Sequence, residues 1–249
     1  MRSVPTPLSE ILAYLSDIGY GDLYLRSPSR SPLGAAAQAP APARAPELTV
    51  PPSPPPRELS PGAASRAAEL ESLAATVAGC TRCRLAEGRK SVVFGSGNPA
   101  ADLMLIGEGP GAEEDRQGLP FVGPAGELLT KIIQAIEMKR EDVYIANVVK
   151  CRPPGNRDPQ PDEVQACRGY LEKQIALVRP KVLVALGRTA AQALLGTESP
   201  IGQLRGRWYQ AFGVPTMVTY HPAALLRNQA LKRPAWEDMQ QVRDRLRGG

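Results

Sequence analysis

The sequence predicts an α/β fold: a three-layer α/β/α sandwich around a central, mainly parallel four-stranded sheet. Two observations predict it. From residue 102 onward, short continuous apolar runs alternate with longer segments whose apolar residues recur at helical spacing. This strand-helix order is repeated several times, which is typical of parallel strands connected by helices on both faces of a sheet.

Residues 1–30 are predicted to contain one short amphipathic helix. Pro7 suits a first helical turn and Gly19 suits a stop. Between them, apolar residues recur at helical spacing at Leu8, Ile11, Leu12, Leu15 and Ile18. Such a helix either docks into the groove of a protein partner or packs at its own terminus, and both alternatives stay open.

Residues 31–63 are predicted to be a disordered linker. Ten of the thirty residues from Pro32 to Pro61 are proline. A stretch of this composition buries too little apolar surface to offset the entropy lost on ordering. The folded domain is therefore expected to span residues 64–249.

The charge of the chain is concentrated on this domain. The net charge is +5, and residues 1–65 carry five arginines and five acidic residues, which cancel. A basic domain suits a polyanionic partner, although mild basicity also serves solubility alone. Apolar runs of membrane-spanning length and a signal-peptide pattern are both missing, so we expect a cytoplasmic protein that does not contact a membrane.

The first half of the domain is predicted to contain a strand, a helix and a second strand. The apolar run Asp102–Ile106 leads into a Gly/Pro-rich turn, as a buried strand does. Apolar residues recur at helical spacing over Gly126–Met138. Val143–Val149 is again a continuous apolar run, interrupted only by Asn147.

The second half continues the same alternation. Pro161–Val178 is predicted to be a helix, because two acidic residues stand in its first turn. Lys181–Leu186 reads as a third strand, and Arg188–Leu195 as a short helix ended by Gly196.

Pro215–Tyr220 is the predicted fourth strand. The last helix starts after His221-Pro222, since proline suits a first helical turn, and is expected to break at Pro234 before Trp236–Leu246 resumes it. Ligands of such sheets bind beyond the carboxyl ends of the strands. The loops that follow these strands span Gly107–Gly126, Asn147–Arg157 and Tyr220–Arg227.

The four cysteines are candidate ligands. Cys80 and Cys83 form a C-x-x-C pair, Cys151 lies at the end of the second strand, and Cys167 lies in the following helix. In a reducing compartment, metal or cluster ligation is commoner than a disulfide. Four thiolates suit tetrahedral zinc or an iron–sulfur cluster, and spacing does not separate the two. Buried cysteines without a ligand are the third alternative.

The loop after the first strand is rich in glycine. Gly107–Gly111 either lets backbone amides approach an anion or forms an ordinary tight turn. It lacks the third glycine of a dinucleotide-binding loop and the Lys-Ser/Thr of a P-loop. The acidic run Glu113-Glu114-Asp115 is interpreted as a solvated face of a helix start or of a loop.

Three side chains in the predicted loops suit ligand binding. Phe121, bracketed by Pro and Gly, either stacks on a nucleobase, at ~1–3 kcal/mol per base, or anchors its loop. Asn147 binds either neighbouring backbone or the edge of a base. His221, the single histidine, is either structural or a hydrogen-bond donor to a substrate.

Taken together, these segments resemble the family-four uracil-DNA glycosylases from about Ala74 to the end of the chain. The matching segments are C-T-R-C at 80–83, G-E-G-P-G-A-E-E-D at 107–115, P-F-V-G-P-A-G at 120–126, N-V-V-K-C-R-P-P-G-N-R at 147–157, Cys167 and H-P-A-A-L-L-R-N at 221–228.

The resemblance implies a monomeric DNA-repair enzyme, associated with the nucleoid, that flips uracil out of DNA and hydrolyses its N-glycosidic bond to leave an abasic site. It also implies a [4Fe-4S] cluster on Cys80, Cys83, Cys151 and Cys167. Two alternatives remain: an inactive module that binds uracil or single-stranded DNA, and a zinc-stabilised structural protein.

The resemblance further implies roles in the uracil pocket. Phe121 would stack on the uracil beside Gly107, and Asn147 would bind the edge of the base and reject cytosine. His221 would donate a hydrogen bond to uracil O2 as negative charge develops on the ring.

Three further roles concern water and DNA. Superfamily relatives carry an aspartate, which handles the water, where this chain has Gly109; Glu108 or the backbone of residues 107–109 would take that role. Leu225 would fill the gap left by the flipped base. Arg227 and Arg157 would contact phosphates.

Overall fold

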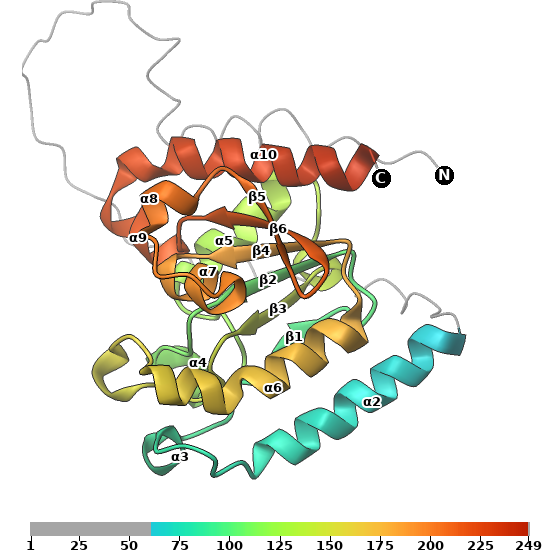
Figure 1. Ribbon diagram of the computed structural model, residues 1–249, viewed down its shortest axis with the longest axis vertical. Helices are drawn as coiled ribbons and strands as arrows, with labels where there is room; N and C mark the ends of the chain where they lie inside the picture. Colours follow the sequence, from blue (N-terminus) through green and yellow to red (C-terminus); the bar gives the residue numbers. More distant parts are fainter. Residues whose placement is uncertain (1–60, 249) are drawn as a thin grey trace, which may run out of the picture.

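A computed structural model describes residues 61–248 and shows one mixed six-stranded sheet (Figure 1). The helix expected within residues 1–30 and most of the expected linker lie outside the described residues. The strand order is β1-β3-β2-β4-β6-β5. The strands are β1 (Ser96–Gly97), β2 (Leu103–Gly107), β3 (Tyr144–Asn147), β4 (Val182–Leu186), β5 (Trp208–Ala211) and β6 (Val214–Thr219).

The four predicted strands form the parallel centre of the sheet, which confirms the α/β fold class. Two further strands were not predicted: β1 pairs antiparallel with β3, and β5 pairs antiparallel with β6. The strand β1 has only two residues, too few for a periodic pattern. The strand β5 forms a hairpin with β6 through Phe212 and Gly213, both of which have positive φ angles.

Most helices from Pro124 onward lie on expected segments, whereas the helices at Pro61–Ala78, Leu85–Gly88 and Ile201–Leu204 were not predicted. The helices are α2 (Pro61–Ala78), α3 (Leu85–Gly88), α4 (Ala112–Gln117), α5 (Pro124–Ala135), α6 (Pro161–Val178), α7 (Arg188–Leu195), α8 (Ile201–Leu204), α9 (Pro222–Arg227) and α10 (Lys232–Gly248). The helix α2 starts three residues before the expected domain boundary at residue 64.

The expected helix break at Pro234 is wrong. The chain leaves the helical conformation at Asn228, whose side chain accepts a hydrogen bond from the backbone N–H of Ala230. Pro234 instead lies in the first turn of α10, where the missing N–H has no intrahelical partner to lose.

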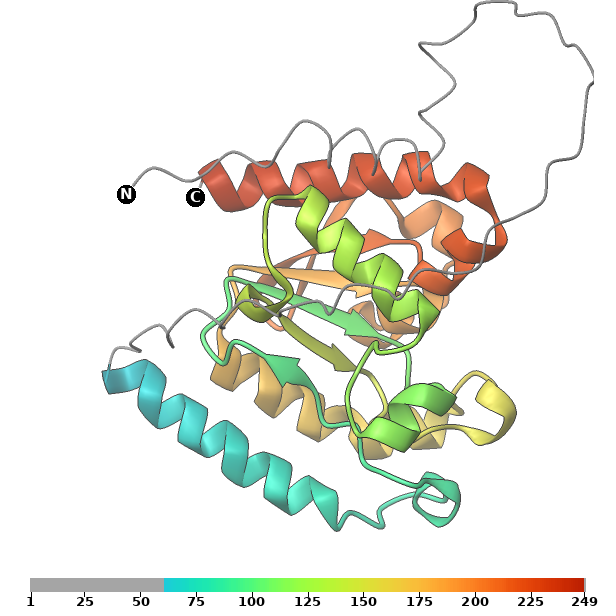
Figure 2. The ribbon, with the colours of Figure 1, turned by 180° about the vertical axis from the view of Figure 1, so that it is seen from behind.

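Helices cover both faces of the sheet (Figure 1). The side chains of β2 point alternately to the two faces of the sheet. Met104 and Ile106 pack in the core with α6 and α7. Leu103 and Leu105 pack in the core with α5 and α10. The helix α2 lies outside α6, as both views show (Figure 2). The side chain of Arg66 ties the two helices by donating to the carbonyl of Leu177 at 3.0 Å.

The carboxyl ends of the parallel strands meet at one edge of the sheet. Gly107 at the end of β2 is in register with Asn147 at the end of β3. The backbone N–H of Gly187, after β4, donates to the carbonyl of Thr219 at the end of β6. The loops after these strands therefore lie together. Within the described helices, none has the length and apolar character needed to cross a bilayer.

Candidate functional site

A pocket of about 380 Å³ opens at this edge of the sheet. All three loops that the sequence singled out contribute to it. Seven of the predicted site residues line it: Glu108, Gly109, Phe121, Asn147, Arg157, His221 and Arg227. Contacts place an eighth, Gly107, against Asn147 and Phe121.

Phe121 is held in a strained conformation against the pocket. Its φ angle is 53°, in the left-handed region that non-glycine residues rarely adopt. The side chain is 6% exposed, and its ring centroid lies 5.5 Å from that of His221 at an interplanar angle of 31°. Phe121 is thus both an anchor of its loop and one wall of the pocket.

The carboxylate of Glu114 holds the Phe121 loop in place. Its Oε1 accepts hydrogen bonds from the backbone N–H groups of Val122 and Gly123, at 3.0 and 3.1 Å. Its Oε2 accepts from Gly111 at 3.1 Å. Arg140 also holds the loop, by donating to the carbonyl of Pro120 at 2.6 Å. Glu114 therefore organises the loop as well as lining the pocket.

The expectation of a solvated acidic face is wrong for two of its three residues. Glu114 makes the contacts above, and Asp115 is 2% exposed and accepts from the backbone N–H of Lys90 at 2.8 Å. The spacing of Gly111 and Glu114 matches a helix capping box, with glutamate at the third helical position, and this signal could have found Glu114.

Asn147 presents an unpaired acceptor. The side chain is 2% exposed, and Oδ1 is the one buried side-chain nitrogen or oxygen in residues 61–248 without a hydrogen-bond partner. A buried carbonyl oxygen without a partner costs roughly 1–3 kcal/mol. Such a cost is typical of a group that a ligand satisfies.

His221 is neutral and oriented. Its Nδ1 accepts a hydrogen bond from the backbone N–H of Ala223 at 3.1 Å, so Nε2 carries the proton. Burial, aided by the positive charge of Arg227, lowers the pKa of His221 to about 4. Gly187 leaves room for the ring, since a Cβ at that position would lie 2.9 Å from His221 Cβ.

Glu108 and Gly109 occupy the turn after β2. The hydroxyl of Thr189 donates to Glu108 Oε2 at 2.5 Å. Burial raises the pKa of Glu108, and this hydrogen bond opposes the rise. A Cβ on Gly109 would lie 2.8 Å from Val149 Cγ2, so the space beside Gly109 is already filled. The carboxylate available in this turn is that of Glu108.

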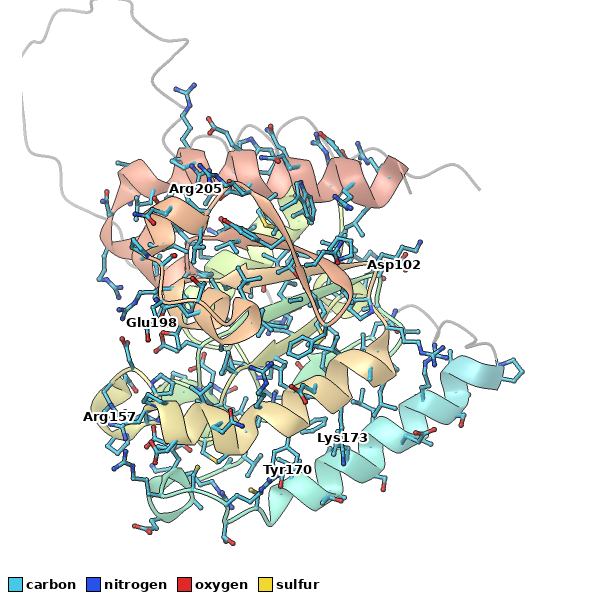
Figure 3. The ribbon with its side chains drawn as sticks, in the orientation of Figure 1. Asp102, Arg157, Tyr170, Lys173, Glu198 and Arg205 are labelled. Carbon is cyan, nitrogen blue, oxygen red and sulfur yellow. The ribbon has the colours of Figure 1, made fainter. Side chains whose placement is uncertain are left out.

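One predicted DNA contact, Leu225, does not fit its position, and a second, Arg157, lines the pocket but is held by an ion pair. Leu225 is 2% exposed and packs into the core with α5 and α10, so it is not available to fill a gap in DNA. The next residue of α9, Leu226, is 45% exposed. Both terminal nitrogens of Arg157 donate to Glu163, at 2.7 and 2.8 Å, and so tie the loop after β3 to α6 (Figure 3).

The four cysteines gather where α3, α6 and the loop after β3 meet. All four are free thiols. Cys80 and Cys83 lie close enough to Cys151 to contribute to the raised pKa of its thiol. Cys83 and Cys151 do the same for Cys167. Among residues 61–248, no group of three or more His, Cys, Asp or Glu side chains is arranged to hold a single metal ion.

Hydrogen-bond donors also face these sulfur atoms. Arg89 donates to Cys151 Sγ at 3.3 Å. The hydroxyl of Tyr170, which projects from α6 toward the turn after α2, donates to Cys80 Sγ at 3.4 Å (Figure 3). Donors of this kind stabilise thiolates, the form in which cysteine binds metals.

Comparison with known proteins agrees with this arrangement. The family model of the uracil DNA glycosylase superfamily matches residues 94–240. The type-4 uracil-DNA glycosylase of Saccharolobus solfataricus is 45% identical over 187 residues, covering 71% of this chain and 86% of its own length. That of Thermotoga maritima is 44% identical over 178 residues, covering 70% and 93%. The type-5 uracil-DNA glycosylase of Thermus thermophilus is 32% identical over 159 residues, covering 51% and 72%. The chain therefore belongs to the uracil-DNA glycosylase superfamily and, within it, to the type-4 family.

Proposed function

We propose that this protein flips uracil out of DNA and hydrolyses its N-glycosidic bond, leaving an abasic site for base excision repair. The unpaired Oδ1 of Asn147 carries this proposal. Uracil offers an N3–H donor beside the O4 acceptor, and a carboxamide matches that pair. Cytosine offers an acceptor and a donor in the reverse order, so its binding would leave buried polar groups unpaired.

Phe121 and His221 complete the recognition of the base. The ring of Phe121 stacks on the flipped uracil, and Gly107 leaves the space that this ring and the Asn147 carboxamide occupy. The Nε2–H of His221 donates to uracil O2, where negative charge develops as the bond breaks. A donor placed in this way contributes about 3–4 kcal/mol. Because the pKa of His221 is about 4, the imidazole stays neutral at physiological pH and donates a hydrogen bond without carrying a charge.

Glu108 is the proposed holder of the attacking water. Its carboxylate lines the pocket, and the neighbouring Gly109 packs too closely against Val149 to be replaced by a carboxylate side chain without a shift. A carboxylate beside the sugar also offsets the positive charge that develops there as the glycosidic bond breaks.

Leu226 and Arg227 are the proposed DNA contacts of α9. Leu226 is exposed next to the pocket and takes the wedge role that the buried Leu225 does not fit. Arg227 lines the pocket and, within the described residues, has no ion-pair partner, which leaves its guanidinium for a phosphate. The protein acts as a monomer on chromosomal DNA in the cytoplasm, associated with the nucleoid.

A [4Fe-4S] cluster held by Cys80, Cys83, Cys151 and Cys167 completes the proposal. Two observations support this assignment. The four cysteines are free thiols that lie near one another, and Arg89 and Tyr170 donate hydrogen bonds to two of the sulfur atoms. A site of four protein ligands supplies a structural link between the C-x-x-C turn and the domain. The similarity to the type-4 uracil-DNA glycosylases favours a cluster over zinc, since four thiolates suit both.

Strand cleavage at a uracil tests the function. The purified protein is incubated with a labelled oligonucleotide bearing one uracil, and abasic sites are cleaved with alkali. We expect cleavage that requires uracil and falls at least 100-fold in Asn147→Ala and His221→Ala. Gly169→Ala on α6 is the control, because a Cβ there meets nothing within 4 Å. Tight binding of uracil-DNA by folded protein without an abasic product would instead identify an inactive binding module.

A further inference from the structure

We propose that Thr189 is a positioning residue for Glu108: its hydroxyl fixes one carboxylate oxygen and thereby turns the other toward the attacking water. The inference rests on the proposed function and deepens it. It assigns a role to a residue of α7 that lies outside the matching motifs.

The contact is specific to the folded chain. Thr189 is the second residue of α7, and Glu108 lies 81 residues earlier, in the turn after β2. The donor Oγ1 lies 2.5 Å from Oε2. Within residues 61–248, no hydrogen-bond donor contacts Oε1, the other oxygen of the carboxylate. One oxygen is thus held by the protein while the second is free to bind water in the pocket that Glu108 lines.

The start of α7 is itself tightly placed. Gly187, the residue before the helix, has a φ angle of 93° and donates its backbone N–H to Thr219 at 2.9 Å. The same glycine lies against His221, since a Cβ there would be 2.9 Å from the Cβ of the histidine. One turn therefore places the hydroxyl of Thr189 against Glu108 and accommodates His221, and these two partners line the same pocket.

The charged groups around Glu108 do not replace the effect of Thr189 on the pKa of its carboxylate. Burial raises the pKa of Glu108, and the hydrogen bond from Thr189 is the largest opposing effect. Asp158 raises the pKa further and Arg188 lowers it, but these two residues form an ion pair with each other. His221, across the pocket, is neutral. Thr189 therefore favours the ionised form of the carboxylate as well as orienting it.

Thr189→Val removes the hydroxyl and keeps the shape of the side chain, whereas Thr189→Ser keeps the hydroxyl. The rate of uracil release is measured under single-turnover conditions across the pH range, together with KM, for both variants. We expect the valine variant to lose roughly tenfold in kcat at neutral pH with KM little changed, and the acid limb of its profile to move up by about one pH unit. The serine variant should restore the position of that limb. Thr76→Val, on the exposed face of α2, is the control.

A double variant separates positioning from stability. In Glu108→Gln the acid limb should be gone, and adding Thr189→Val should cause no further loss, because both changes act on one carboxylate. Equal profiles for the valine and serine variants, or a loss that follows only the melting temperature, would overturn the inference. If the unaltered protein releases no uracil, the proposed function fails first. If it is active and Thr189→Val keeps its pH profile, only the role of Thr189 fails.

Discussion

Gly107 and Asn147 lie opposite each other at the ends of β2 and β3, so close that a Cβ on Gly107 would lie 2.5 Å from Asn147 Oδ1. The same Cβ would lie 2.6 Å from Phe121 Cζ. Only a hydrogen atom at position 107 allows the carboxamide and the aromatic ring to occupy their places. The floor of the pocket thus depends on the absence of a side chain.

Gly107→Ala should abolish uracil release while leaving a folded protein. The added methyl group displaces Asn147 and Phe121, and we expect kcat/KM to fall at least 100-fold, with a loss of ~1–3 kcal/mol in the free energy of unfolding. Urea denaturation and excision assays measure the two effects. Gly169→Ala should instead stabilise α6 by ~0.5–1 kcal/mol and keep full activity. Full activity of Gly107→Ala would contradict the geometry of the pocket floor.

His221 should stay neutral down to about pH 5. Its pKa in the folded protein is about 4, against an ordinary value of 6.5. The unfolded chain therefore binds the proton more readily, so the protein should lose stability as pH falls from 6.5 toward 4, with no further loss from this group below 4. The chain has a single histidine, so one imidazole C–H resonance in an NMR titration reports this pKa. A midpoint above pH 6 would show that the imidazole is solvated.

Glu163→Gln should destabilise the protein at neutral pH and much less in acid. The side chain is fully buried and accepts hydrogen bonds from Arg157, Arg84 and the backbone of Gln160. The bonds from Arg157 above all lower the pKa of Glu163 to about 2. Its contribution is therefore complete above pH 4.5 and is lost as pH falls toward 2.

We expect this substitution to cost ~1–3 kcal/mol at pH 7, because its arginine partners are partly exposed. Glu172→Gln, which breaks the exposed pair with Arg168, should cost less than ~0.5 kcal/mol. Urea denaturation at pH 7 and pH 3 checks both values. A difference between the parent and Glu163→Gln that is equal at the two pH values would contradict the linkage.

Cys83→Ala should remove iron and loosen the segment before β1. The turn that carries Cys80 and Cys83 would lose its link to Cys151 and Cys167, and we expect a lower melting temperature together with loss of visible absorbance and of iron per chain. Thr81→Ala lies in the same turn without a thiol and should keep its iron. Unchanged metal content and melting temperature in Cys83→Ala would refute the ligand assignment.

Much of the fold and of the site followed from the sequence alone, because the relevant signals are local. Buried parallel strands are continuous apolar runs, and α6 and α7 have the expected bounds. Several site residues lie at the ends of strands or in the loops after the strands, where such sheets bind ligands: the glycines, Phe121, Asn147 and His221. Their place along the chain, together with the parallel arrangement of the strands, accounts for their meeting at one pocket.

The remaining features depend on contacts between distant residues, which have no local signal. Adjacent leucines of α9 differ in exposure, 2% for Leu225 and 45% for Leu226, because the packing of α9 against α5 decides which side faces the core. Arg157 is paired with Glu163, since α6 brings a buried carboxylate beside it. The hydroxyl of Thr189 meets Glu108 only because β2 and β4 are neighbours in the sheet. Composition and periodicity determine the elements of this protein, whereas the packing of those elements determines which side chains meet.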